Sequence, residues 1–161
     1  MLKKGPSKKP RSKRSHNDAG VKFDSDTERH FYEALVKLGH PFQFQVKYML
    51  IGPTIHKERP DKKNPIALFR DRGAEAVTLT VDFELEKDGI HYILDTKGSK
   101  RHATTVSYLK YDILKHKIAG EGRAETTRIL FINAQEVMAL AKAAAFAPDM
   151  FWELFFKIKE R

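Results

Sequence analysis

Two segments of alternating apolar and polar residues, joined by a short turn, constrain the fold of this chain more than any other feature. Apolar side chains occupy every second position over 77–86 and recur over 90–97, a period that predicts strands with one buried face. The residues between them are Lys87-Asp88-Gly89, and an Asp-Gly pair favours a tight hairpin turn. The sequence therefore predicts a β-hairpin.

The remaining periodic segments predict helices on both sides of this hairpin. Ser25-Asp26-Thr27-Glu28 matches a capping box, in which a serine and a glutamate three residues later bind each other's free amides, and Gly39 suits a helix end. Helical spacing continues in two later segments, and Pro148 can open a last helix. The predicted elements are a helix over 26–38, strands over 42–50, 77–86, 90–97 and 128–132, and helices over 104–119, 134–146 and from 148.

The order of these elements predicts an α/β fold. A helix between the third and fourth strands favours a right-handed crossover and a parallel strand pair. We expect a mixed sheet of about four strands flanked by helices, in one domain over 21–161. The segment 52–75 holds three prolines and many charges, and we expect a long loop there.

Composition excludes several classes of site. The chain of 161 residues has no cysteine, which rules out disulfides, thiolate catalysis and cysteine-bound zinc or iron–sulfur clusters. No apolar run is long enough to cross a membrane, and the N-terminus lacks the apolar stretch of a secretory signal. We expect a cytoplasmic protein without membrane contact.

The net charge of +9 is concentrated at the N-terminus. Residues 1–18 hold seven lysines and arginines against a single acid, Asp18. We expect a disordered basic arm over 1–20, because such a composition buries too little apolar surface to fold. Arms of this kind commonly contact nucleic-acid phosphates, although a solubilising tail has the same composition. The candidate phosphate contacts are Lys8, Lys9, Arg11, Lys13 and Arg14.

The predicted hairpin carries the residues that suit catalysis. Asp82 lies on the polar side of its strand, and Asp95 and Lys97 are two residues apart, so they project from one face of the next strand. Phosphodiester hydrolysis uses a divalent cation held by a few carboxylates, and a lysine can orient the attacking water and offset negative charge. A solvated strand face with a cross-strand ion pair is the simpler alternative.

These residues also resemble a nuclease signature. Val81-Asp82-Phe83, followed across the turn by Ile93-Leu94-Asp95-Thr96-Lys97-Gly98, resembles the motif of the PD-(D/E)xK superfamily. Phe23-Asp24-Ser25-x-x-Glu28 resembles the helix element of its phage members, and the whole arrangement is similar to phage endonuclease I-type Holliday junction resolvases. The resemblance covers residues 21–133. Val81 stands where proline is usual, and Asp95 replaces the commoner glutamate.

The resemblance implies a restriction-endonuclease-like core and a metal-dependent DNA endonuclease. It implies that Asp82, Asp95 and Glu28 hold Mg²⁺ or Mn²⁺ and that Lys97 positions the water. A capping-box role explains Glu28 without catalysis. Lys100, Arg101 and His102 follow the motif and are candidates for phosphate contacts.

Several functions remain open within this class. A resolvase cuts two symmetric strands, so we expect a homodimer that acts on branched DNA. The alternatives are a recombination, transposon or flap nuclease on another DNA substrate, and a binding module on the same fold that has lost activity.

Overall fold

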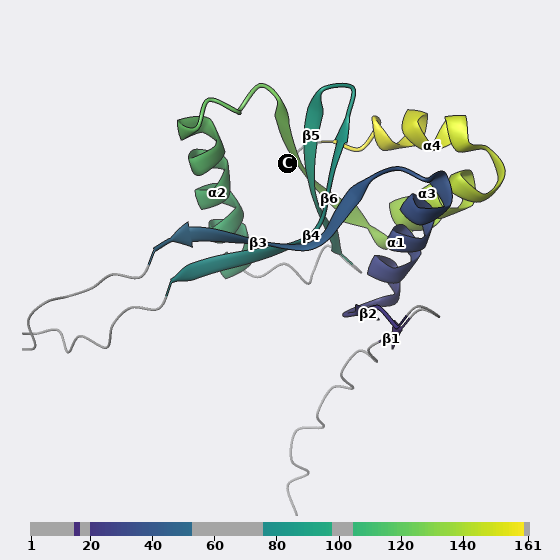
Figure 1. Ribbon diagram of the computed structural model, residues 1–161, viewed down its shortest axis with the longest axis horizontal. Coiled ribbons are helices and arrows are strands. Elements are labelled where there is room, and N and C mark those ends of the chain that lie inside the picture. The colour runs from purple at the N-terminus through teal and green to yellow at the C-terminus, as the bar shows by residue number, and fades with distance from the viewer. Residues whose placement is uncertain (1–14, 17–19, 53–75, 98–104, 160–161) are drawn as a thin grey trace, which may run out of the picture. The chain divides into compact units, whose positions relative to one another are not determined.

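The computed structural model describes residues 15–16, 20–52, 76–97 and 105–159. These residues form an α/β fold with a four-stranded mixed sheet, as the sequence predicts (Figure 1). No helix in the described ranges is long and apolar enough to cross a membrane. The chain divides into two compact units, which we describe separately: the first lies within 1–40, 96–99 and 132–159, and the second within 41–95 and 100–131.

The sheet has the order β3-β4-β5-β6. Its strands are β3 (Phe42–Ile51), β4 (Val77–Lys87), β5 (Ile90–Lys97) and β6 (Thr127–Asn133). The first three pair antiparallel, and β3 and β4 run side by side as a long twisted pair (Figure 1). The amide of His91, at the start of β5, donates to the carbonyl of Thr126, just before β6. Both strands therefore begin at the same end, which is the expected parallel pair.

The turn between β4 and β5 has the conformation that its sequence favours. Asp88 and Gly89 both have positive φ, 54° and 76°, which a two-residue hairpin turn of the primed type requires. Aspartate and glycine tolerate this region of the backbone better than most residues. The local sequence thus fixes the register that brings β4 and β5 together.

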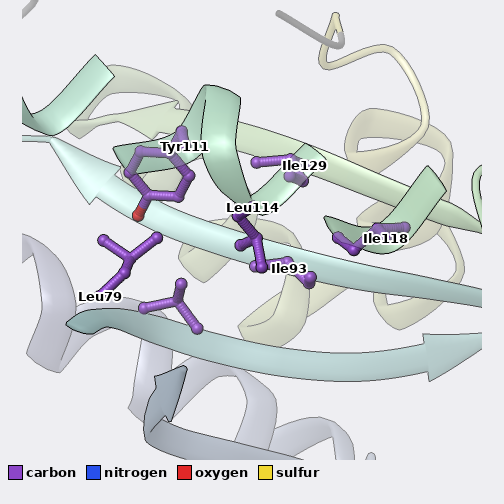
Figure 2. Close-up of a cluster of buried hydrophobic side chains, with 7 residues drawn as sticks. Leu79, Ile93, Tyr111, Leu114, Ile118 and Ile129 are labelled. Carbon is purple, nitrogen blue, oxygen red and sulfur yellow. The ribbon is translucent and has the colours of Figure 1, made fainter. Parts of the chain in front are cut away.

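The helix α2 (Thr105–Gly120) supplies the core of the second unit. Figure 2 shows Tyr111, Leu114 and Ile118 of this helix gathered with strand residues in one apolar cluster. All members of the cluster are buried, so the hydrophobic effect fixes the helix on this side of the sheet. The strand members are Leu79, Val81, Ile93 and Ile129.

Three helices form the core of the first unit: α1 (Asp26–Leu38), α3 (Ala134–Phe146) and α4 (Pro148–Phe155). Contacts join α1 to α3 and α3 to α4. The rings of Phe31 and Phe151 stack at 6.4 Å between centroids, and both side chains are fully buried. Gly39 ends α1 with φ of 64°, as expected, and Pro148 opens α4.

One short pairing differs from the sequence-based expectation. The strand β1 (Ser15–His16) pairs antiparallel with β2 (Lys22–Phe23), so residues 15 and 16 form structure within the segment that we expect to be a disordered arm. Two-residue strands have no measurable periodicity, which is why the pattern of side chains does not reveal them. The ring of Phe23 is buried and packs edge-on against Tyr32 of α1 at 5.2 Å.

Candidate active site

Asp82 lies where the regular strand ladder is interrupted. Phe44 pairs with Phe83 and Val46 pairs with Val81, so Gln45 faces Asp82, but no ladder pair joins these two residues in the described strands. Gln45 has φ of 54°, a left-handed conformation that is uncommon for a residue with a side chain. Irregular positions of this kind re-aim side chains and are frequent beside active sites.

The core cluster shows that β4 changes face at this irregular position. Ile93 pairs with Glu84, so their side chains lie on the same side of the sheet. Ile93 also belongs to the same core cluster as Val81, although residues three apart in a regular strand point to opposite sides. The strand must therefore turn between Val81 and Glu84, the stretch that contains Asp82.

Asp95 lies in β5, two residues beyond Ile93 and hence on the side of the sheet that α2 covers. Its side chain is buried, and it accepts a hydrogen bond from the hydroxyl of Tyr111. Tyr111 is buried too, and its ring packs edge-on against Phe131 at 4.7 Å. The helix thus places the uncharged hydroxyl of Tyr111 beside the carboxylate of Asp95, which is shielded from water.

The electrostatics of Tyr111 link the two aspartates. Its pKa is raised far above the usual value, first because burial disfavours the phenolate. The negative charge of Asp95 raises the pKa further, followed by the charge of Asp82 and by the hydrogen bond to Asp95. Both carboxylates therefore lie near the hydroxyl of Tyr111, and all three residues belong to the second unit.

The other two predicted catalytic residues belong to the first unit. Lys97 is the last residue of β5 and is partly exposed, and its position two residues after Asp95 directs both side chains to the same side of the strand. Glu28 lies in the first turn of α1 and is buried. The structure thus brings Asp82 together with Asp95 and places Lys97 on the Asp95 strand.

Glu28 has a local structural role at the start of α1. Its amide donates to the hydroxyl of Ser25 at 3.1 Å, which confirms Ser25 as the N-cap. The prediction of a reciprocal capping box is wrong in one detail, because Oε2 of Glu28 accepts from the amide of Asp24 at 2.6 Å. A buried carboxylate engaged in this way stabilises the helix start, whatever else it does.

The pair of aspartates fits a hard divalent cation. Magnesium is commonly bound in proteins by one or two carboxylates, and waters and substrate oxygens complete its coordination. Among the residues with described positions, no group of three or more histidine or acidic side chains could hold a metal. A cation at Asp82 and Asp95 would therefore take its further ligands from water and phosphate.

Other predicted contacts lie outside the described residues. These are the arm residues Lys8, Lys9, Arg11, Lys13 and Arg14, and the three that follow the motif, Lys100, Arg101 and His102. The predicted loop also lies there, except for Gly52.

Two residues of the site are not identified by the sequence-based reasoning. Tyr111 fits the apolar spacing of its helix, so it reads as a core residue. The only signal is its hydroxyl, since a buried tyrosine usually needs a hydrogen-bond partner. Gln45 carries no signal at all, because it continues the alternation of β3 without interruption.

The comparisons do not place this chain in a family. No protein-family model, no curated protein and no solved structure matches it. The site therefore has to be interpreted from its own residues.

Proposed function

We propose that this chain is a metal-dependent DNA endonuclease of the PD-(D/E)xK type, acting on branched DNA such as a Holliday junction. The observation that carries the proposal is the position of Asp82 and Asp95 on neighbouring strands, each adjacent in sequence to a member of the Phe83–Leu94 pair. The resemblance of the hairpin to the superfamily signature supports the same assignment.

Each residue has a distinct role in this proposal. Asp82 and Asp95 would hold Mg²⁺ (or Mn²⁺), which when bound supplies positive charge beside the scissile phosphate. Tyr111 fixes the orientation of the Asp95 carboxylate through its hydrogen bond. Lys97 would orient the attacking water and offset the negative charge that develops on the phosphate. Glu28 remains a predicted ligand besides its capping role.

The charge distribution supports DNA as the substrate. The basic N-terminal segment would contribute affinity by neutralising phosphates, which is independent of base sequence and decreases with salt. Resolution of a junction requires two symmetric cuts, so the proposed enzyme acts as a homodimer, with recombination as its setting.

The test is cleavage of labelled four-way junction, flap, duplex and single-stranded DNA, each with Mg²⁺ and with EDTA. We expect paired symmetric nicks in the junction that disappear with EDTA. We expect Asp95→Asn to lower the cleavage rate by at least about a hundredfold, because a neutral amide is a poor ligand for a hard cation. DNA binding should change little.

Asp149→Asn is the matched control, since it removes the same charge from an exposed aspartate in the first turn of α4. Its cleavage rate should equal that of the wild type. Preferential cleavage of another substrate would retain the nuclease and reject the resolvase. Tight binding of every substrate without cleavage would instead indicate an inactive binding module.

A further inference from the structure

A hollow of about 350 Å³ lies on the second unit, beyond the two aspartates along the sheet. We call it the Glu84 hollow. It combines apolar side chains with polar groups of several kinds, as sites for small organic groups do. Its lining residues are Pro41, Phe42, Gln43, Glu84, Leu85, Glu86 and His91.

Glu84 is an unusual residue for a strand position in a core. It is 7% exposed, and its Oε2 lies 3.1 Å from Nε2 of His91. Its second oxygen, Oε1, is buried and has no hydrogen-bond partner among the described residues. A buried acceptor without a donor costs free energy, so the site favours a ligand that brings one. Rotation about the terminal torsion of a glutamate side chain is soft and can present this oxygen to the hollow.

Two further groups of the second unit interact with the Glu84 carboxylate. The hydroxyl of Tyr48 hydrogen-bonds it, and burial together with this bond raises the pKa of Tyr48 well above its usual value. The charge of Arg123 acts on Tyr48 and Glu84 from the loop after α2. Glu84 is thus a charged acceptor with partners away from the hollow, since neither Tyr48 nor Arg123 lines it.

The residues of the hollow select one kind of ligand. An acceptor carboxylate beside the amide of Gln43 and the apolar Pro41 and Phe42 suits a flat ring with an amino group. Nucleobases have this chemistry, and glutamate accepts hydrogen bonds from the amino group of cytosine.

The hollow lies at a suitable distance from the proposed scissile phosphate. Glu84 pairs with Ile93, and Asp95 follows Ile93 two residues later on the same side of β5. Two residues of a strand span about 7 Å, which is comparable to the length of one nucleotide. A base attached to the sugar next to a phosphate at Asp95 could therefore reach Glu84.

We propose that the Glu84 hollow binds an unstacked nucleobase with an exocyclic amino group, next to the phosphate that is cleaved. The inference rests on the proposed function, because it takes DNA as the ligand. It adds a preference for sites at which a base is free to leave the stack, as at a branch or in a single strand.

The test is the binding of fluorescent dC and dT dodecamers at pH 8 in EDTA, measured by anisotropy. Both bases are pyrimidines, so the difference in affinity isolates the amino group. We expect the dC oligonucleotide to bind about tenfold more tightly, the value of one hydrogen bond to a charged acceptor. Glu84→Gln should reduce the preference to about threefold, because a neutral acceptor contributes roughly half as much free energy. Glu84→Met should abolish it.

Glu125→Gln is the matched control, since Glu125 is exposed and does not line the hollow. It should retain the tenfold preference. Equal affinity of the wild type for both oligonucleotides, or a full preference in Glu84→Gln, would overturn the inference. Circular dichroism checks the fold of each variant, and Glu84→Gln still decides if Glu84→Met does not fold.

Cleavage is measured separately, so the two proposals can fail independently. A preference for dC in a chain that cleaves no DNA would support base binding in the Glu84 hollow and contradict the proposed nuclease activity. Cleavage without any preference for dC would support the nuclease activity and contradict base binding in the hollow.

Discussion

Tyr111 shows how a single hydroxyl can connect a helix to two strands. Its ring belongs to the core cluster of the second unit, while its hydroxyl donates a hydrogen bond to the carboxylate of Asp95. Phenylalanine would fill the same space but would leave the buried carboxylate with one donor fewer. The hydroxyl therefore matters for the site, and the ring for the core.

We expect Tyr111→Phe to lower the free energy of unfolding by about 2 kcal/mol, the usual cost of removing a hydrogen bond to a buried charged group. Urea unfolding followed by circular dichroism measures the change. Tyr108→Phe is the control, because Tyr108 lies on the same helix and is 41% exposed. A loss of the same size in both variants would show that the bond to Asp95 contributes nothing.

Gln45 has the backbone conformation that makes the irregular position of β4 possible. A β-branched residue is strongly disfavoured at φ of 54°, so we expect Gln45→Val to lower the free energy of unfolding by about 1–2 kcal/mol. Lys47→Val, at the next exposed position of β3, should change stability by less than about 0.5 kcal/mol. Equal effects of the two substitutions would mean that the conformation at Gln45 stores no strain.

The catalytic candidates are recognisable in the sequence because their chemistry stands out from the alternation around them. Asp82 and Asp95 are acids inside apolar runs, and the structure brings them together near Tyr111. Gln45 could not be predicted, since its conformation results from how two strands meet and not from its own preference. The same is true of Glu84, whose surroundings come from four separate segments.

At the scale of elements, the sequence predicts the helices and long strands to within one or two residues. The reason is that capping residues and turn residues act locally: Ser25 and Gly39 bound α1, and Asp88-Gly89 joins β4 to β5. One further cap has the same kind of sequence signal but is not among the predicted features. Asn133 and Glu136 form a reciprocal capping box at the start of α3, directly at the end of a buried strand. The short pair β1–β2 depends on contacts that no local pattern encodes.

Replacing two helix-terminal glycines by alanine should change the free energy of unfolding in opposite directions. Gly39 has φ of 64° and nothing within 4 Å of an added Cβ, so Gly39→Ala should cost about 1 kcal/mol through the backbone alone. Gly120 lies inside the last turn of α2 and also has free space, so Gly120→Ala should add about 0.4–1 kcal/mol. Thermal unfolding should show a lower melting temperature for Gly39→Ala and a higher one for Gly120→Ala. Stabilisation by Gly39→Ala would contradict the assigned helix end.

At the scale of the whole molecule, the buried tyrosines determine how the fold responds to alkali. The pKa values of Tyr48 and Tyr111 are raised, in both cases mainly by burial. In the unfolded chain these groups ionise near pH 10. Their contribution to stability is therefore complete below about pH 10 and is lost as the pH rises above it, because only the unfolded state releases the protons.

We expect the free energy of unfolding to fall steeply above about pH 10. Urea titrations at a series of pH values, with tyrosinate absorbance recorded in parallel, measure it. The double variant Tyr48→Phe, Tyr111→Phe should show a flatter decline from a lower starting stability. Ionisation of all five tyrosines near pH 10 in a chain that stays folded would contradict the raised pKa values.

Two lysines of α2 bind the strand ends on either side of the 53–75 segment. Nζ of Lys110 donates to the carbonyl of Thr78 at 2.8 Å, and Nζ of Lys117 donates to the carbonyl of Met49 at 2.9 Å. Side chains of the helix thus secure the end of β3 and the start of β4. Two fragments that meet between these strands should consequently reassemble into the folded protein, because α2 binds both strand ends.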